Sequence, residues 1–233
     1  MAQSLPLVLV PGLLCSARLY APQVAALWTH GPVTVADHRR DGEIGAVAKR
    51  ILETAPPRFA LAGLSYGGYI AFELVRQAPE RIVKLALLDT SARADTPEQT
   101  AGRKLQIAMA QAGRFDEIPA LVMPRFLHRN RQHDEGLTGL VRRMAVETGP
   151  DAFMRQLNAI ISRPDSRPLL PSIRCPTLVL VGDGDEATPP ELAHEIAAGI
   201  SGAKLTIVPD CGHLSTIEQP EPVNAALAEW LDL

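Results

Sequence analysis

The sequence is poor in cysteine and carries no large excess of charge of either sign. Its three cysteines are an odd number without Cys-x-x-Cys spacing, which argues against a disulfide framework or a zinc site and fits a reducing cytoplasm. Lysine and arginine number 23 against 26 for aspartate and glutamate, and this net charge of −3 offers no electrostatic basis for binding nucleic acid. Because no cluster of side chains has the spacing of metal ligands, we expect no metal.

Long apolar runs are also missing. Residues 1–14 have no basic segment, and their apolar stretch is far shorter than a membrane span, so we expect neither a signal peptide nor a membrane partner. The 233 residues, of which 46% are hydrophobic, are enough for one α/β domain with a sizeable core. A monomer and a homodimer are both compatible with this composition.

Apolar, strand-like runs alternate with helical patterns through most of the chain. Strands buried on both faces of a parallel sheet have such continuous apolar runs, and repeated strand–helix–strand units imply helices on both faces. We therefore predict an α/β fold with a mostly parallel, doubly wound sheet. The predicted strands span residues 5–10, 33–37, 59–64, 82–89, 176–182 and 203–209, and the predicted helices span 19–28, 44–55, 66–78, 190–200 and 221–231.

Residues 91–170 interrupt this alternation. They contain no convincing strand and their pattern is typical of short helices broken by glycine and proline. We predict a single core domain made of residues 1–90 and 171–233, with residues 91–170 inserted as a small helical cap before the last two strands. Capping signatures place Thr188 and Ser215 at the N-cap positions of two later helices.

The segment Gly63-Leu64-Ser65-Tyr66-Gly67 matches Gly-x-Ser-x-Gly and lies between a predicted strand and a predicted helix. In a nucleophile elbow, this pattern puts the serine on a sharp, strained turn and exposes its Oγ above the sheet. Gly63 and Gly67 remove side chains that would clash where strand and helix pass closely. We predict that Ser65 is a nucleophile.

A serine hydroxyl needs a base to take its proton and a carboxylate to orient that base. His213 follows the last predicted strand, at the edge where ligands bind in parallel sheets, and is the predicted base. Asp185 is the predicted acid, while Asp183 is assigned to the backbone amides of its turn. Asp89, after an earlier strand, is the alternative acid. The order Ser65, Asp185, His213 is the chain order of this elbow.

Two backbone N–H groups are predicted to form an oxyanion hole. The first is that of Tyr66, at a helix N-terminus where the dipole favours negative charge. The second comes from the loop after the first strand, where Leu13 is the favoured donor and Leu14 the alternative. Gly12 lets this loop approach the serine. His38, which follows the second strand, is the next histidine considered for a direct role.

Basic side chains in the predicted cap are candidates for substrate contacts. Arg125 and Arg129, together with Arg131, can recognise a carboxylate or phosphate, and His128 can line the path of the substrate. The other interpretation is a solvated helix face of mixed charge, because two acidic residues follow closely. If the arginines bind the substrate, acidic esters or acyl-CoA thioesters should be preferred over neutral esters.

Four segments in this order, VLVPGLL, GLSYGG, LVLVGDGDEATPP and CGHLSTIEQPEPVNAAL, resemble the α/β-hydrolase superfamily. The second half is most similar to the branch of 3-oxoadipate enol-lactonases and small carboxylesterases. There, similar stretches supply the acid at the position of Asp185 and the base at that of His213. The chain has Pro11 where the family often has a histidine before Gly12. It has Tyr66 where the enol-lactonases typically have methionine.

The residues and the resemblance together predict a serine hydrolase without a cofactor. It would cleave a small to medium carboxylic ester or lactone through an acyl-enzyme intermediate. A thioesterase, a perhydrolase and a carbon–carbon hydrolase use the same triad and stay open as alternatives, because a fold does not decide between them. A ligand receptor with slow turnover is the alternative outside enzymes.

Overall fold

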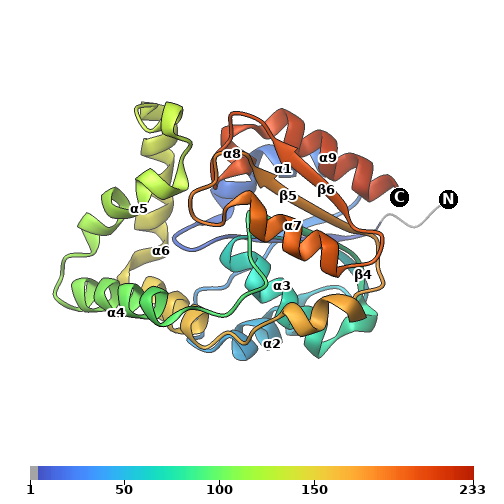
Figure 1. Ribbon diagram of the computed structural model, residues 1–233, viewed down its shortest axis with the longest axis horizontal. Helices are drawn as coiled ribbons and strands as arrows, with labels where there is room; N and C mark the ends of the chain where they lie inside the picture. Colours follow the sequence, from blue (N-terminus) through green and yellow to red (C-terminus); the bar gives the residue numbers. More distant parts are fainter. Residues whose placement is uncertain (1–4) are drawn as a thin grey trace.

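A computed structural model describes residues 5–233 of the protein (Figure 1). Residues 1–4, part of the segment in which we expect no signal peptide, lie outside the described residues. Six strands form one sheet in the order β2-β1-β3-β4-β5-β6, and every neighbouring pair is parallel. The strands are β1 (Leu7–Val10), β2 (Val33–Val35), β3 (Phe59–Leu64), β4 (Ile82–Leu88), β5 (Thr177–Gly182) and β6 (Lys204–Val208).

Burial of the strands follows their place in the sheet. β1, β3 and β5 are buried along their whole length, as their apolar runs predict. β2 and β6 form the two edges and are partly exposed. β2 ends at Val35, two residues earlier than predicted, so Asp37 and His38 lie in the loop beyond it.

Helices cover both faces of the sheet. α1 (Ala21–Leu27) packs against α9 (Pro220–Asp232), and α2 (Ile44–Thr54) packs against α3 (Tyr66–Gln77). Figure 1 shows these two pairs on opposite sides of the strands, which confirms the predicted doubly wound α/β fold. The remaining core helices are α7 (Pro190–Gly199) and the short α8 (Ser215–Glu218).

Three helical segments occupy the part of the chain between β4 and β5. In Figure 1 they form a group to one side of the core, in green and yellow. Residues 91–170 contain no strand, as the sequence predicts. The third segment spans 27 residues, but Gly149, with φ 74° and ψ 164°, and Pro150 break its helical backbone into two shorter helices, as the glycine and proline pattern predicts. The three are α4 (Pro97–Gln111), α5 (Ile118–Phe126) and α6 (Glu135–Ile161). Within residues 5–233, no helix has the length and apolar character needed to cross a membrane.

The two N-cap predictions are wrong. α7 has Pro189 at its N-cap and α8 has Leu214, and neither side chain accepts a capping hydrogen bond. The hydroxyl of Thr188 donates to a carboxylate in the loop before α7, and that of Ser215 donates to a carboxylate at the end of β4. The Ser215 hydroxyl is therefore used in a tertiary contact, and the Thr188 hydroxyl is used within the loop that carries Asp185; a capping pattern reveals neither.

Candidate active site

Ser65 lies in the turn from β3 into α3, at the carboxyl edge of the sheet. Its φ of 56° and ψ of −115° form a backbone conformation that residues other than glycine rarely adopt. A Cβ on Gly63 would overlap the backbone of Gly67, and a Cβ on Gly67 would overlap the backbone of Val10. Both glycines are therefore required where the turn passes β1, and this tight turn carries the Ser65 hydroxyl past the strand ends.

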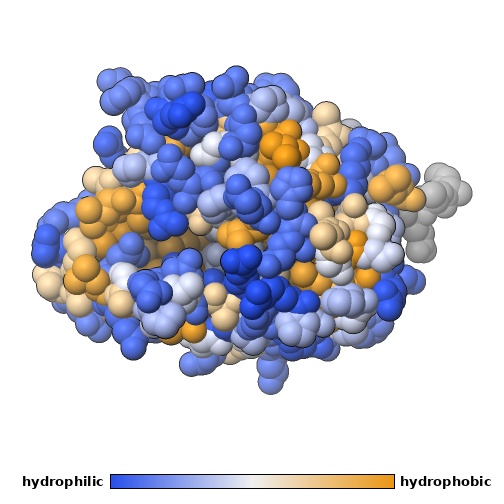
Figure 2. Space-filling view, in the orientation of Figure 1, coloured by the Kyte–Doolittle hydropathy of each residue, from blue (hydrophilic) through white to orange (hydrophobic). Residues whose placement is uncertain are grey.

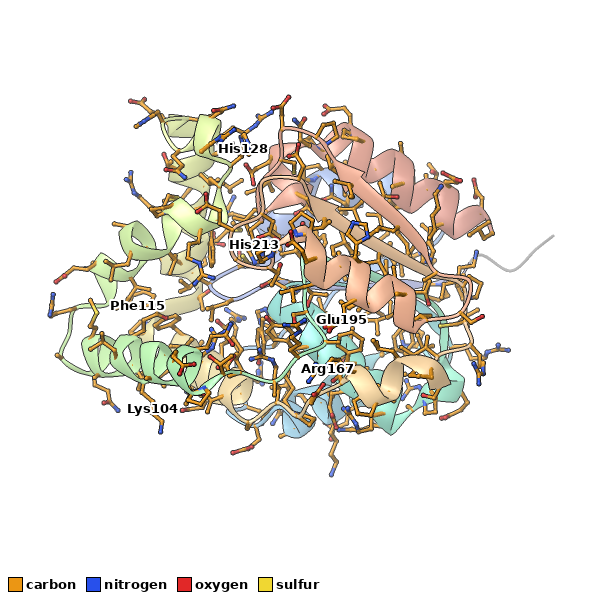
Figure 3. All side chains as sticks on the ribbon, in the orientation of Figure 1. Lys104, Phe115, His128, Arg167, Glu195 and His213 are labelled. Atoms are coloured by element: carbon orange, nitrogen blue, oxygen red, sulfur yellow. The ribbon has the colours of Figure 1, made fainter. Side chains whose placement is uncertain are left out.

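His213 lies in the loop after β6 and faces Ser65. Its Nε2 atom is 2.8 Å from Ser65 Oγ, and its Nδ1 atom is 2.8 Å from Asp185 Oδ2. Asp185 comes from the loop after β5, so all three side chains follow the carboxyl ends of parallel strands. Both His213 and Asp185 are buried. Figure 3 shows His213 where the group of α4, α5 and α6 faces the core.

Hydrogen bonds around Asp185 fix the proton positions on His213. Asp185 Oδ1 accepts from the backbone N–H groups of Ala187 and Thr188, both at 2.8 Å, and Oδ2 accepts from the Thr188 hydroxyl at 2.7 Å. A carboxylate that only accepts requires the imidazole proton on Nδ1. Nε2 is then free to accept the proton of the Ser65 hydroxyl.

The other two acidic candidates have different partners. Asp89 Oδ1 accepts from the Gly182 N–H at 3.0 Å, and its Oδ2 accepts from the Ser215 hydroxyl. Complete burial, with the Asp185 charge nearby, raises the pKa of Asp89 well above its usual range. Asp183 Oδ1 accepts from the Cys211 N–H of the loop after β6 at 3.2 Å, so its partner lies in another loop, whereas the sequence predicts a partner in its own turn. Of the three acids, Asp185 is the one hydrogen-bonded to His213.

The loop after β1 passes beside Ser65. Neither the Leu13 N–H nor the Tyr66 N–H donates a hydrogen bond within residues 5–233, and Leu13 lines the cavity at Ser65. The alternative donor, the Leu14 N–H, is already bound to Gln156 Oε1 at 3.2 Å. A Cβ on Gly12 would meet neighbouring atoms at 3.4 Å, which is ordinary contact, so space alone does not require glycine there.

A cavity of about 480 Å³ opens beside Ser65 and His213. Figure 2 shows a hollow on this face, with apolar side chains around it and mostly hydrophilic surface beyond. This volume suits a small or medium organic molecule. The core contributes Leu13 and Tyr69 to its wall, and the inserted helices contribute Gln99, Arg103, Arg125 and Phe126.

The arginines around this cavity differ in their partners. Arg103 and Arg163 share the carboxylate of Asp95, at 2.7 and 2.6 Å, and Arg163 also lies 4.1 Å from the centroid of the Tyr69 ring. Arg125 instead donates to two backbone carbonyl groups of the loop after β5, at 3.3–3.4 Å. Within the described residues, Arg125 forms no ion pair, so its charge is available to a ligand in the cavity.

His128 and Arg129 do not line the Ser65 cavity. They border a separate hollow together with acidic residues of the loops after β5 and β6. His128 is buried, and its backbone N–H donates to Glu218 Oε2 at 2.8 Å. Figure 3 labels His128 apart from His213. Of the three cap residues predicted to contact substrate, Arg125 is the one that the structure places beside Ser65.

Several residues contact His213 or the loops around Ser65, and the sequence does not predict these contacts. Phe126 packs on His213 with 5.6 Å between ring centroids. Glu218, whose pKa is raised by burial, accepts from the Leu214 N–H and so supports the loop that carries His213. In the sequence, Glu218 belongs to the pattern that predicts Ser215 as a helix N-cap. Nothing in the sequence around Gln156 marks it as a neighbour of the loop after β1.

Comparison with known proteins places this arrangement in a family. The sequence model of the Alpha/beta hydrolase family matches residues 7–226, almost the whole chain. The chain belongs to this family. The match confirms the resemblance seen in the sequence and, with it, the prediction of a hydrolase that acts on ester bonds.

Solved and curated relatives of the hydrolase agree with this class. An esterase from Thermogutta terrifontis, solved with malate bound, has a TM-score of 0.88 and 30% identity, covering 98% of this chain and 89% of its own. The enol-lactonase from Burkholderia xenovorans has a TM-score of 0.88 and 27% identity, covering 100% of this chain and 93% of its own. Pimeloyl-(acyl-carrier protein) methyl ester esterase of Neisseria meningitidis is 25% identical over 224 residues, 91% of this chain and 85% of its own.

Proposed function

We propose that the protein is a serine hydrolase that cleaves a small to medium carboxylic ester or lactone carrying an anionic group. Ser65, His213 and Asp185 are its catalytic triad. The observation that carries the proposal is the position of His213, which is 2.8 Å from Ser65 Oγ on one side and 2.8 Å from Asp185 Oδ2 on the other. No metal or organic cofactor has a step in this mechanism.

In the first half of the reaction, Ser65 Oγ attacks the substrate carbonyl carbon while His213 Nε2 takes the hydroxyl proton. Asp185 holds the imidazole in the productive tautomer and stabilises the imidazolium that forms. The tetrahedral intermediate collapses when His213 returns the proton to the leaving alcohol, which leaves an acyl group on Ser65. In the second half, His213 takes a proton from water, the resulting hydroxide attacks the acyl carbon, and Ser65 is released with its proton.

The negative charge on the carbonyl oxygen is assigned to two backbone donors. The Tyr66 N–H lies at the start of α3, where the first N–H groups of a helix have no partner within the helix. Leu13, whose N–H is the second donor, lines the cavity beside Ser65. Donors aimed at a developing oxyanion lower the barrier more than they stabilise the neutral ester, because the charge exists only along the reaction.

The anionic group of the substrate is inferred from Arg125. Arg125 lines the cavity, and its guanidinium has no carboxylate partner in the described part of the chain. The other arginines of the cavity are each paired with a carboxylate, Arg93 with Glu195 and both Arg103 and Arg163 with Asp95. The Thermogutta esterase was solved with malate, a dicarboxylate, which supports the same chemistry for this chain. We further propose that residues 91–170 act as the cap under which the substrate is enclosed.

The test is a comparison of hydrolysis rates across one panel, with Ser65→Ala beside the wild type. The panel holds p-nitrophenyl esters of increasing acyl length, the monomethyl and dimethyl esters of one dicarboxylic acid, an enol-lactone and an acyl-CoA thioester. We expect the monomethyl ester to exceed the dimethyl ester in kcat/KM, and Ser65→Ala to lose at least about 10³-fold.

Ser201→Ala, an exposed serine, is the matched control and should keep the wild-type rate. Equal, near-background rates in wild type and Ser65→Ala would overturn the hydrolase proposal and favour the receptor alternative. A thioester that surpasses every ester would keep the triad and change the substrate class.

A further inference from the structure

A closed set of hydrogen bonds lies behind the loop after β1, on the side away from Ser65. His38 Nε2 is 3.2 Å from the Gly12 carbonyl oxygen, and Gln156 Nε2 is 3.3 Å from His38 Nδ1. Gln156 Oε1 then accepts from the Leu14 N–H at 3.2 Å. These bonds link the Gly12 carbonyl to His38, which follows β2, then His38 to Gln156 of α6, and Gln156 to the Leu14 N–H.

The direction of each bond in this set is fixed by one group that can only donate. Because a backbone N–H donates, the atom of Gln156 that faces Leu14 must be its oxygen, and the atom that faces His38 is its nitrogen. Nδ1 of His38 therefore accepts, and the imidazole proton lies on Nε2. That proton points at the Gly12 carbonyl, so every donor in the set meets an acceptor.

His38 is suited to stay in this neutral tautomer. Both His38 and Gln156 are buried, and burial lowers the pKa of His38 to about 4. The imidazole also packs on the Tyr66 ring, with 5.4 Å between centroids. A protonated imidazole would carry a second N–H toward the Gln156 amide, which has no free acceptor on that side.

The Gly12 carbonyl and the Leu13 N–H belong to the same peptide group. A trans peptide group is planar and its C=O and N–H point in opposite directions. The Gly12 carbonyl accepts from the Cys15 N–H at 3.2 Å as well as from His38, and with the carbonyl held on this side the Leu13 N–H points the other way, toward the cavity that Leu13 lines. On the other side of Leu13, Leu14 has φ 60°, a strained value for a residue with a side chain, and the bond to Gln156 holds it.

We propose that His38 and Gln156 are positioning residues for the oxyanion hole, which orient and polarise the peptide group that donates the Leu13 N–H. This inference rests on the proposed function, in which Leu13 is an oxyanion donor. His38 occupies this role in a chain that has Pro11, without a side-chain donor, next to Gly12. Because Gln156 belongs to the inserted segment, the insert takes part in the chemistry of the core and not only in enclosing the substrate.

Two substitutions at His38 separate positioning from general stability. In His38→Gln, the side-chain amide nitrogen falls near the place of Nε2 and can donate to the Gly12 carbonyl. In His38→Asn, the shorter amide falls near the place of Nδ1 and cannot reach it. The readouts are kcat and KM for p-nitrophenyl acetate, the inhibition constant of phenylboronic acid, which forms a tetrahedral adduct with a nucleophilic serine, and the melting temperature.

We expect His38→Asn to lower kcat about 10- to 100-fold with KM within about threefold of wild type, because a misplaced donor loses its effect on the transition state. Phenylboronic acid should bind more weakly by a similar factor. His38→Gln should return kcat to within about fivefold of wild type. Gln156→Met, which removes both of its hydrogen bonds while keeping an unbranched side chain, should repeat the kcat loss. His194→Asn, at an exposed histidine of α7, should behave as wild type.

The inference is overturned if His38→Asn and Gln156→Met keep wild-type kcat and boronate affinity while Ser65→Ala is inactive, and the proposed function then stands. It is also overturned if His38→Gln and His38→Asn lose activity equally and only in step with melting temperature. If His38→Asn does not fold, Gln156→Met and His38→Gln decide by the same criteria. Activity retained in Ser65→Ala would instead remove the proposed function on which the inference rests.

Discussion

The parallel core and the inserted helices contribute to the site in different ways. In the core, Ser65, Asp185 and His213 each follow a strand, and the pairing of parallel strands brings their loops to one edge. In the insert, the side chains at the cavity come from helices and from the segments that flank them, as Arg163 after α6 is paired with Asp95 before α4. The three side chains of the proposed triad therefore stand at strand ends of the core, while the insert contributes much of the wall of the cavity.

The two regions are nevertheless joined at points that matter for the site. Phe126 of α5 packs on His213, and the backbone N–H of His128 donates to Glu218 below the same loop. Gln156 of α6 reaches the loop after β1. Substitutions in each region separately test whether the core carries the reacting groups and the insert selects the substrate.

The largest effect on kcat is expected for Asp185, the proposed acid of the triad. Asp185→Asn should lower kcat by about 10³- to 10⁴-fold, because an amide at this position favours the wrong tautomer of His213. Steady-state kinetics and a melting curve measure the two consequences separately. Asp89→Asn is the matched control, since a carboxyl whose pKa is well above the usual range is mimicked by an amide. An inactive Asp89→Asn beside an active Asp185→Asn would exchange their roles.

The next effect concerns the stability of the insert. Asp95→Ala leaves the buried guanidinium of Arg163 without a counter-charge and should lower the free energy of unfolding by about 3 kcal/mol. For a chain of this size, that corresponds to roughly 6–12 °C in melting temperature. Asp165→Ala breaks the more exposed pair with Arg167 and should cost at most about 1 kcal/mol. Equal melting temperatures in the two variants would contradict the different burial of the pairs.

A pH effect is expected from His38. Its pKa is lowered by burial from 6.5 to about 4, so the unfolded chain takes up a proton at a higher pH than the folded chain. The free energy of unfolding should therefore fall as the pH decreases from about 6.5 to 4, by at most about 3 kcal/mol, and this contribution should be constant outside that window.

His38→Gln should remove this part of the pH dependence, and the difference between wild type and variant cancels the other titrating groups. The nearest charges, Asp37 and Arg39, shift the pKa of His38 in opposite directions. The free energy of unfolding of both proteins is measured by denaturant titration at several pH values between 4 and 7. Parallel curves would show that His38 does not titrate in this window.

The smallest expected effect concerns recognition of the substrate's carboxylate by Arg125 of the insert. Arg125→Gln should raise KM for the monomethyl ester of a dicarboxylic acid about tenfold and leave the dimethyl ester unchanged, because the lost interaction is with the free carboxylate. Arg129→Gln, at the separate hollow, is the control and should alter neither. A KM increase for both esters alike would assign Arg125 to the shape of the cavity and not to charge recognition.

The parts of the molecule that could be predicted are those whose pattern is local. Continuous apolar runs predict β1, β3 and β5 because both faces of these strands are buried. The glycine spacing around Ser65 predicts the turn, since each glycine meets backbone that a Cβ would overlap. Ser215 shows the opposite case, in which a local pattern for capping is overridden by the carboxylate of Asp89, 126 positions away along the chain.

The sequence by itself determined the class of fold, the place of the nucleophile turn and the candidates for base and acid, because strand burial, helix periodicity and glycine geometry are properties of neighbouring residues. Only the tertiary structure decided that Asp185 and not Asp89 reaches His213, that Arg125 and not Arg129 lines the cavity at Ser65, and that His38 and Gln156 meet behind the loop after β1. Those contacts join residues as far apart as 118 positions along the chain. Their partners are chosen by the packing of sheet and insert, which no local pattern contains.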